Sequence, residues 1–127
     1  MEDIVYLDTH VVVWLYAGRS ELLSEQVADL IEQNDILISP IVELELQYLF
    51  ETERILVKPD KIIDVLSTEI QLKICDLPFQ NIINKAVSLN WTRDPFDRII
   101  TSQASVYNRI LITKDQTILE NYKNAIW

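Results

Sequence analysis

Short apolar runs alternate with amphipathic segments along this chain of 127 residues. Runs dominated by Ile, Leu and Val predict buried strands at 4–7, 36–38, 72–77, 109–113 and 125–127. Apolar residues that recur every three or four positions predict helices at 11–16, 24–33, from 39 onward, 60–70, 80–89, 96–107 and 115–122. This alternation predicts an α/β fold with a mostly parallel sheet, helices on both faces and right-handed crossovers. The order of the strands does not follow from the pattern.

The composition fits one packed domain over 1–127. Hydrophobic residues make up 49% of the chain, and one Gly and four Pro leave little material for a flexible linker. The net charge of -9 argues against broad attraction to nucleic acid or to an anionic membrane. Cys75 has no second cysteine to pair with, so we expect a buried thiol. No leader-like segment and no run of about 18 apolar residues is present, so we expect a cytoplasmic protein without membrane contact.

Four acidic residues lie at or just past the points where strand-like runs give way to helices: Asp8, Glu45, Asp97 and Asp115. Ligands of a parallel α/β sheet bind beyond the carboxyl ends of the strands, so acids delivered there can converge. Converging carboxylates repel one another and need a cation or shared protons to coexist. The pattern therefore predicts a divalent-metal site and metal-assisted hydrolysis. Taken singly, Asp8 and Asp115 are equally well read as helix N-caps.

The helix that begins at Ser39-Pro40 carries two carboxylates, which a helical wheel separates. Apolar residues surround the direction of Glu45, whereas Glu43 falls on the polar side. A carboxylate inside an apolar arc is costly unless it is paired or metal-bound, so Glu45 is the functional candidate and Glu43 a surface charge. The arc is wide for one interface and indicates burial against a second subunit as well.

Asp94-Pro95-Phe96-Asp97 has the form of an N-cap, Pro at the first helical position and an acid at the third. Both acids together could serve only to stabilise the helix start. If Asp94 is the cap, Asp97 is free to point at the strand ends. We therefore interpret Asp97 as a ligand and Asp94 as structural.

The residues that are missing exclude several other chemistries. His10 is the only histidine, so a Cys/His zinc site cannot form and a hydrolase triad would depend on His10 without a nucleophile elbow. Gly18 is the only glycine, which excludes a Gly-rich phosphate loop. Ligands that are all oxygen atoms favour Mg²⁺ or Mn²⁺.

With these residues in view, the chain resembles the PIN-domain nucleases, specifically VapC-type toxins of type II toxin–antitoxin systems. The matching segments occur in the family's order along nearly the whole chain: Leu7-Asp8-Thr9-His10 with Trp14-Leu15, Ser39-Pro40-Ile41-Val42 through Glu45-Leu46, Arg93-Asp94-Pro95-Phe96-Asp97-Arg98, and Thr113-Lys114-Asp115. The resemblance implies a three-layer α/β/α sandwich and an endoribonuclease dependent on Mg²⁺ or Mn²⁺. It also implies a homodimer and a cognate antitoxin that covers the acidic site.

By position, the family's four acids fall on Asp8, Glu45, Asp97 and Asp115, the set already selected. Thr92 departs from the family pattern, where His is common, and Glu53 stands where Gly is frequent. Thr101-Ser102 also departs from the family pattern, in which this helix is usually more apolar. These departures leave the acids intact and bear on substrate preference and local packing.

RNA contact in an acidic protein must come from local cations, and three lie beside the acids in sequence: Arg93, Arg98 and Lys114. We expect Asp8 and Asp97 to hold the ion and Asp115 to complete its shell. Glu45 either ligates the ion or orients the attacking water. The sequence leaves open whether one or two ions bind and whether Thr113 faces the site or the local backbone.

Two other readings remain. A non-catalytic PIN scaffold would bind a partner protein without cleaving RNA, although an intact acid set argues against it. A phosphohydrolase of the haloacid-dehalogenase type also begins with a strand and an Asp. That chemistry needs a second Asp two residues on, where this chain has His10.

Overall fold

A five-stranded sheet, parallel throughout, passes through the middle of the molecule in the order β3-β2-β1-β4-β5. The structure is a computed structural model and describes residues 3–127. Its strands are β1 (Ile4–Leu7), β2 (Asp35–Ile38), β3 (Lys73–Ile74), β4 (Ile110–Ile112) and β5 (Ala125–Ile126). All five lie where the apolar runs predicted them. The predicted fold class is confirmed, and the sheet is entirely rather than mostly parallel.

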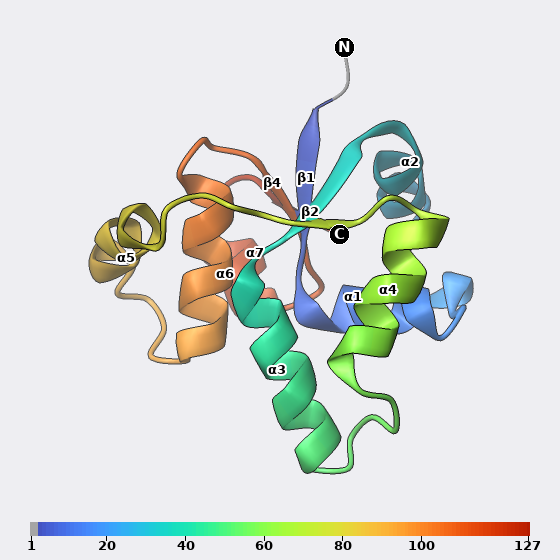
Figure 1. Cartoon of the computed structure of the whole chain (residues 1–127). Helices are drawn as coiled ribbons and strands as arrows, with labels where there is room; N and C mark the ends of the chain where they lie inside the picture. The colour runs from blue at the N-terminus through green and yellow to red at the C-terminus, as the bar shows by residue number, and fades with distance from the viewer. Residues whose placement is uncertain (1–2) are drawn as a thin grey trace.

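Helices cover both sides of this sheet. They are α1 (Thr9–Tyr16), α2 (Glu25–Gln33), α3 (Pro40–Glu51), α4 (Pro59–Glu69), α5 (Phe79–Ser88), α6 (Pro95–Ser105) and α7 (Gln116–Asn121), with a 3₁₀ turn η1 (Ser20–Leu22) that the pattern did not predict. In Figure 1, α5 and α6 lie on one side, α1, α2 and α4 on the other, and α3 descends between them. The result is the expected three-layer arrangement.

The sheet and the helix faces that cover it form the core. Val5, Tyr6 and Leu7 of β1 are buried, as expected for a central strand with helices on both faces. Cys75 is buried and carries a free thiol, as predicted. Within residues 3–127, none of the helices is both long and apolar enough to span a bilayer.

The chain changes direction at β1, and this position locates the site. From β1 it proceeds to β2 and β3 on one side, and β4 and β5 later fill the other side. The Asp8 amide donates to the Ile112 carbonyl at 3.0 Å, which joins the carboxyl ends of β1 and β4. Ligands of open α/β sheets bind at such a switch point, beyond the carboxyl ends of the strands. In Figure 1 this is the lower edge of the sheet.

Candidate active site

Asp8 is held rigidly at the end of β1. Its side chain is 7% exposed. Oδ1 accepts a hydrogen bond of 2.8 Å from the Thr9 amide, and Oδ2 accepts one of 2.7 Å from Thr113 Oγ1. Burial raises the pKa of Asp8, and the two hydrogen bonds oppose that rise. Asp8 therefore caps α1, as the alternative interpretation as an N-cap predicted, while its carboxylate also lies at the switch point.

Glu45 reaches the same region from α3. Its carboxylate accepts a hydrogen bond from Thr9 Oγ1, so the residue that follows Asp8 connects two of the acids. Burial raises the pKa of Glu45, and the negative charge of Asp8 adds to the effect. Glu43, two positions earlier, is exposed. The two carboxylates therefore differ in exposure as the wheel predicted, and the functional role of Glu45 stays a prediction.

Asp94 caps α6 as the spacing predicted, and the role of Asp97 as a ligand stays a prediction. Asp94 Oδ1 accepts hydrogen bonds from the amides of Phe96, at 2.9 Å, and Asp97, at 3.2 Å, so Asp94 caps α6. The Asp97 carboxylate has no hydrogen-bond donor among residues 3–127. It is half-buried, and its pKa rises to about 7 because of burial first and then the charges of Asp8, Asp94, Asp115 and Glu45. Asp97 therefore lies within electrostatic range of the other three predicted acids.

Asp115 is both a helix cap and a member of this cluster. Its Oδ1 accepts a 3.0 Å hydrogen bond from the Ile118 amide, which caps α7. Its charge also raises the pKa values of Asp8 and Asp97. The Asp115 amide donates to Thr113 Oγ1 at 3.0 Å, so Thr113 serves the local backbone and Asp8 together.

Two buried threonines, Thr9 and Thr113, orient the acids, and both are fully buried. The sequence raised Thr113 as a candidate but missed Thr9. The available signal was a Thr directly after an acid at a strand end, because its hydroxyl can donate a hydrogen bond to a carboxylate that lies close by. These two hydroxyls fix the orientations of Asp8 and Glu45.

The three predicted cations are placed differently from one another. Arg98 donates from Nε to the Ala86 carbonyl at 2.8 Å and from an η nitrogen to the Val87 carbonyl at 3.3 Å, at the end of α5. Arg93 is exposed and donates to the Asn90 carbonyl at 3.0 Å. Lys114 lies over the rings of two tryptophans. Arg98 thus has a structural partner, and Lys114, the residue before Asp115, lies against the two indoles.

The donor set fits a hard divalent cation. The converging groups are carboxylates, the ligands that Mg²⁺ and Mn²⁺ prefer, and their repulsion is what a cation would relieve. Within residues 3–127, no three His, Cys, Asp or Glu side chains are already grouped closely enough to ligate one ion. Mg²⁺ usually keeps several waters and uses only one or two carboxylates, so three direct ligands are not required.

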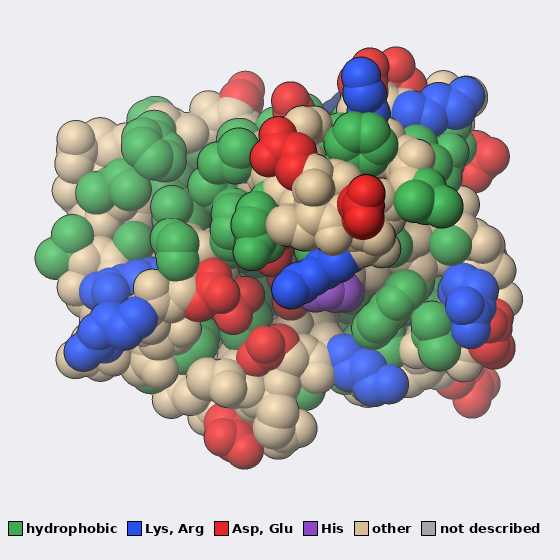
Figure 2. Space-filling model, turned by 90° about the horizontal axis from the view of Figure 1, so that it is seen from below, with side chains coloured by type: hydrophobic (Ala, Val, Ile, Leu, Met, Phe, Trp, Pro, Cys, Tyr) green, Lys and Arg blue, Asp and Glu red, His purple; other side chains and the backbone are tan. Residues whose placement is uncertain are grey.

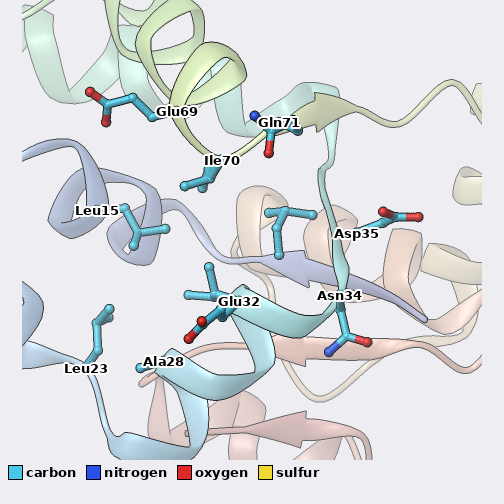
Figure 3. Close-up of a pocket in the computed structure, with 11 residues that line it drawn as sticks. Leu15, Leu23, Ala28, Glu32, Asn34, Asp35, Glu69, Ile70 and Gln71 are labelled. Carbon is cyan, nitrogen blue, oxygen red and sulfur yellow. The ribbon is translucent and has the colours of Figure 1, made fainter. Parts of the chain in front are cut away.

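A cavity of about 540 Å³ lies away from these acids, at the amino end of β2. Figure 3 shows its lining, with Leu15, Leu23 and Ile70 around an apolar interior and Glu32, Asp35 and Glu69 among the polar residues. None of the four acids lines it. The cavity and the acid cluster are therefore separate features.

Comparison with known proteins agrees with this fold. The family description "PIN domain" matches residues 5–124. Among solved structures, VapBC2 from Rickettsia felis bound to a promoter DNA fragment is similar, with a TM-score of 0.68, 22% identity, and 98% of this chain and 96% of that chain covered. VapBC-1 from nontypeable Haemophilus influenzae gives a TM-score of 0.67 and 18% identity, covering 98% of this chain and 96% of that one. A toxin–antitoxin complex from Klebsiella pneumoniae gives 0.64 and 18%, covering 97% and 96%. No curated protein matches.

Proposed function

The chain belongs to the PIN domain family, and on this basis we propose that it is an endoribonuclease that depends on Mg²⁺ or Mn²⁺. The observation that carries the proposal is the arrangement at the carboxyl ends of β1 and β4, where Thr113 donates to Asp8, Thr9 donates to Glu45 and Asp115 begins the next helix. Burial, and then the charges of these three acids, raise the pKa of Asp97. Asp8 and Asp115 also cap helices, but the Asp97 carboxylate accepts no hydrogen bond among residues 3–127 and lies near acids of the same charge. A bound cation would relieve that repulsion and neutralise charge on a phosphodiester.

Each residue has a distinct task in this proposal. Asp8 and Asp97 hold the ion, and Asp115 completes its shell. Glu45, oriented by Thr9, ligates the ion or accepts a proton from the attacking water. A divalent ion supplies charge neutralisation at the phosphodiester and lowers the pKa of water. The Thr113 hydroxyl keeps Asp8 in one orientation, and Lys114 offers its ammonium group to a phosphate.

We further propose that this nuclease is the toxin of a toxin–antitoxin pair and acts on cytoplasmic RNA. The support is the fold shared with three toxin–antitoxin complexes over nearly the whole of each chain. In this role a cognate antitoxin inhibits the enzyme by covering the acidic site. Co-expression of the adjacent reading frame with the toxin tests this: restored growth supports the pair, and unrelieved toxicity contradicts it.

A homodimer is the third part of the proposal. On α3, Leu44 is 57% exposed and Tyr48 46% exposed, although both lie in the wide apolar arc of this helix. The Tyr48 ring packs 6.1 Å from that of Phe96. Exposed apolar area of this kind favours a second copy as its cover. Leu44→Glu is expected to give a monomer by light scattering, whereas Leu56→Glu, at another exposed leucine, leaves the dimer intact.

The decisive experiment is RNA cleavage by the purified protein with Mg²⁺ or Mn²⁺ present. Asp8→Asn and Asp97→Asn should both abolish cleavage, since each removes a carboxylate from the ion. Asp94→Asn is the matched control, because Asn also caps helices and Asp94 lies outside the set. Full activity in both variants would contradict the assignment. A wild-type protein that binds no Mn²⁺ and cleaves no RNA would favour the non-catalytic PIN scaffold.

A further inference from the structure

An aromatic cluster with a lysine lies next to the four acids. It consists of Trp14 in α1, Trp127 after β5, Lys114 between β4 and α7, and His10, and we call it the indole platform. The two indole rings meet edge to face, with centroids 5.6 Å apart at 69°. Lys114 Nζ lies 6.0 Å from the Trp14 centroid and 5.6 Å from that of Trp127. The His10 ring is 6.4 Å from Trp14.

The platform borders the acid site directly. His10 lies in the first turn of α1, two residues after Asp8, and Lys114 immediately precedes Asp115. His10 and Lys114 are exposed, and both indoles are partly exposed. Figure 2 looks at the carboxyl ends of the strands and shows the histidine near the middle of this face, beside a basic side chain and with acidic side chains close by.

Phosphate attraction alone is a weak source of RNA affinity in this protein. The net charge is -9, and Arg98 is bonded to the carbonyls that end α5. Stacking of bases on aromatic rings does not depend on charge, and it works for every base because each has a π-face. A pair of indoles at the edge of the site can therefore supply the RNA affinity that the acidic surface does not.

We infer that the indole platform stacks an unpaired base next to the scissile phosphodiester, while Lys114 contacts a phosphate. This rests on the proposed nuclease function and adds a base-binding surface beside its site. Paired bases in a duplex have their faces covered, whereas bases in loops and single strands are free to stack on aromatic side chains. Packing between α1 and the end of β5 is the competing role of the two indoles.

Binding of a fluorescein-labelled single-stranded oligoribonucleotide tests this inference. Fluorescence anisotropy is measured in Asp97→Asn protein, so that the RNA stays intact. Trp127→Leu should weaken binding about tenfold and leave the salt dependence unchanged. Lys114→Gln should instead make the slope of log K against log salt shallower by roughly 0.7, the value for one phosphate contact on a single strand.

Tyr107→Leu is the matched control for loss of an aromatic ring. Tyr107 is 59% exposed and has Arg109 Cζ 5.0 Å from its centroid, but it precedes β4 and so lies at the other end of the sheet. It should leave RNA binding unchanged. Trp127→Phe keeps a ring and should retain most of the affinity, which separates stacking from packing. Thermal melts confirm that each variant is folded.

An oligonucleotide with abasic positions provides the second arm. Protein with the unchanged indole platform should bind this abasic oligonucleotide about tenfold more weakly than it binds the matched RNA. Trp127→Leu should not weaken binding of the abasic oligonucleotide any further. If the folded Trp127→Leu variant binds RNA as tightly as the protein that keeps Trp127, the inference is overturned and the indoles are packing groups. If the wild-type protein neither cleaves nor binds RNA, the proposed function fails instead, so the two failures are distinct.

Discussion

Two buried polar regions touch the central strand β1, and they treat their polar groups in opposite ways. In the first, which we call the Tyr6 cluster, Tyr6 Oη lies 3.2 Å from Cys75 Sγ and accepts from Arg109 at 3.1 Å, and the Tyr122 hydroxyl donates to the Arg109 carbonyl. In the second, four carboxylates converge, and the pKa of Asp97 rises to about 7. In the first region donors are matched to acceptors, whereas in the second the Asp97 carboxylate has no hydrogen-bond donor among residues 3–127 and lies near other acids that add to the effect of burial on its pKa.

The difference separates stability from function. Burial raises the pKa of Tyr6 to about 12 and so keeps its hydroxyl neutral, which suits a hydrogen-bonded interior. Burial of carboxylates works against their charged form and destabilises the protein unless a cation arrives. The crowding of these acids therefore costs stability, which is the pattern expected of the proposed functional site.

After the loss of Asp8 or Asp97, the largest expected effect falls on Glu45. Glu45→Gln should lower RNA cleavage roughly 100-fold, because it removes charge from the ion or the base from the attacking water. Glu43→Gln on the same helix should leave cleavage unchanged, since Glu43 is exposed. Rates are compared under single-turnover conditions at saturating Mn²⁺. Equal rates for the two variants would remove Glu45 from the site.

Loss of one hydroxyl from the Tyr6 cluster should lower the stability of the protein and leave RNA cleavage unchanged. Tyr6→Phe leaves Arg109 and Cys75 without their shared partner, and the free energy of unfolding should fall by about 1–2 kcal/mol. Cleavage should stay at the wild-type level. Urea denaturation measures the loss, with Tyr107→Phe at an exposed site as the control. A stable but inactive Tyr6→Phe protein would show that the two regions are coupled.

The pH dependence of stability distinguishes the two regions in metal-free protein. The pKa of Asp97 is raised from 3.8 to about 7 on folding, so the folded state binds more protons between these values. In a chelator, stability should therefore fall as the pH rises from about 4 to 7. Asp97→Asn should flatten this fall and add about 1 kcal/mol at pH 8, after allowance for solvent screening. Addition of Mn²⁺ should restore the stability that the wild-type protein loses at high pH. If the stability of the metal-free wild-type protein did not change with pH, the proposed repulsion would be contradicted.

Asp94 gives the smallest effect and marks the boundary of the acid site. It lies beside Asp97 but has matched donors, like the Tyr6 cluster. Asp94→Ala should cost about 1 kcal/mol of stability through loss of the cap, whereas Asp94→Asn should cost little. Thermal melts in the presence of Mn²⁺ measure both. A greater loss for Asn than for Ala would mean that the charge, not the cap, is what matters.

The strands, the helices and the Asp94 cap of α6 were predictable because each depends on local sequence. Hydrophobic period and capping residues act within a few positions. The strand order and the position of Arg98 were not, because they depend on contacts across the fold. Arg98 follows Asp97 directly, yet it bonds carbonyls 11 and 12 residues earlier.

Glu53 shows a departure whose physical meaning emerges only from the backbone. It stands where the family resemblance implied Gly, and its φ is 61°. That left-handed conformation is easy for Gly and unfavourable for other residues. The departure therefore affects the turn after α3, away from the acids, and leaves their convergence untouched.

Direct titration of Mn²⁺ by isothermal calorimetry tests the central claim, that the four acids form a cation site. The account predicts saturable binding to the wild-type protein and to Glu43→Gln. It predicts no measurable binding to Asp8→Asn or Asp97→Asn, each confirmed as folded by thermal melt. Saturable binding that persists unchanged in both Asp variants, or none in the wild-type protein, would contradict it.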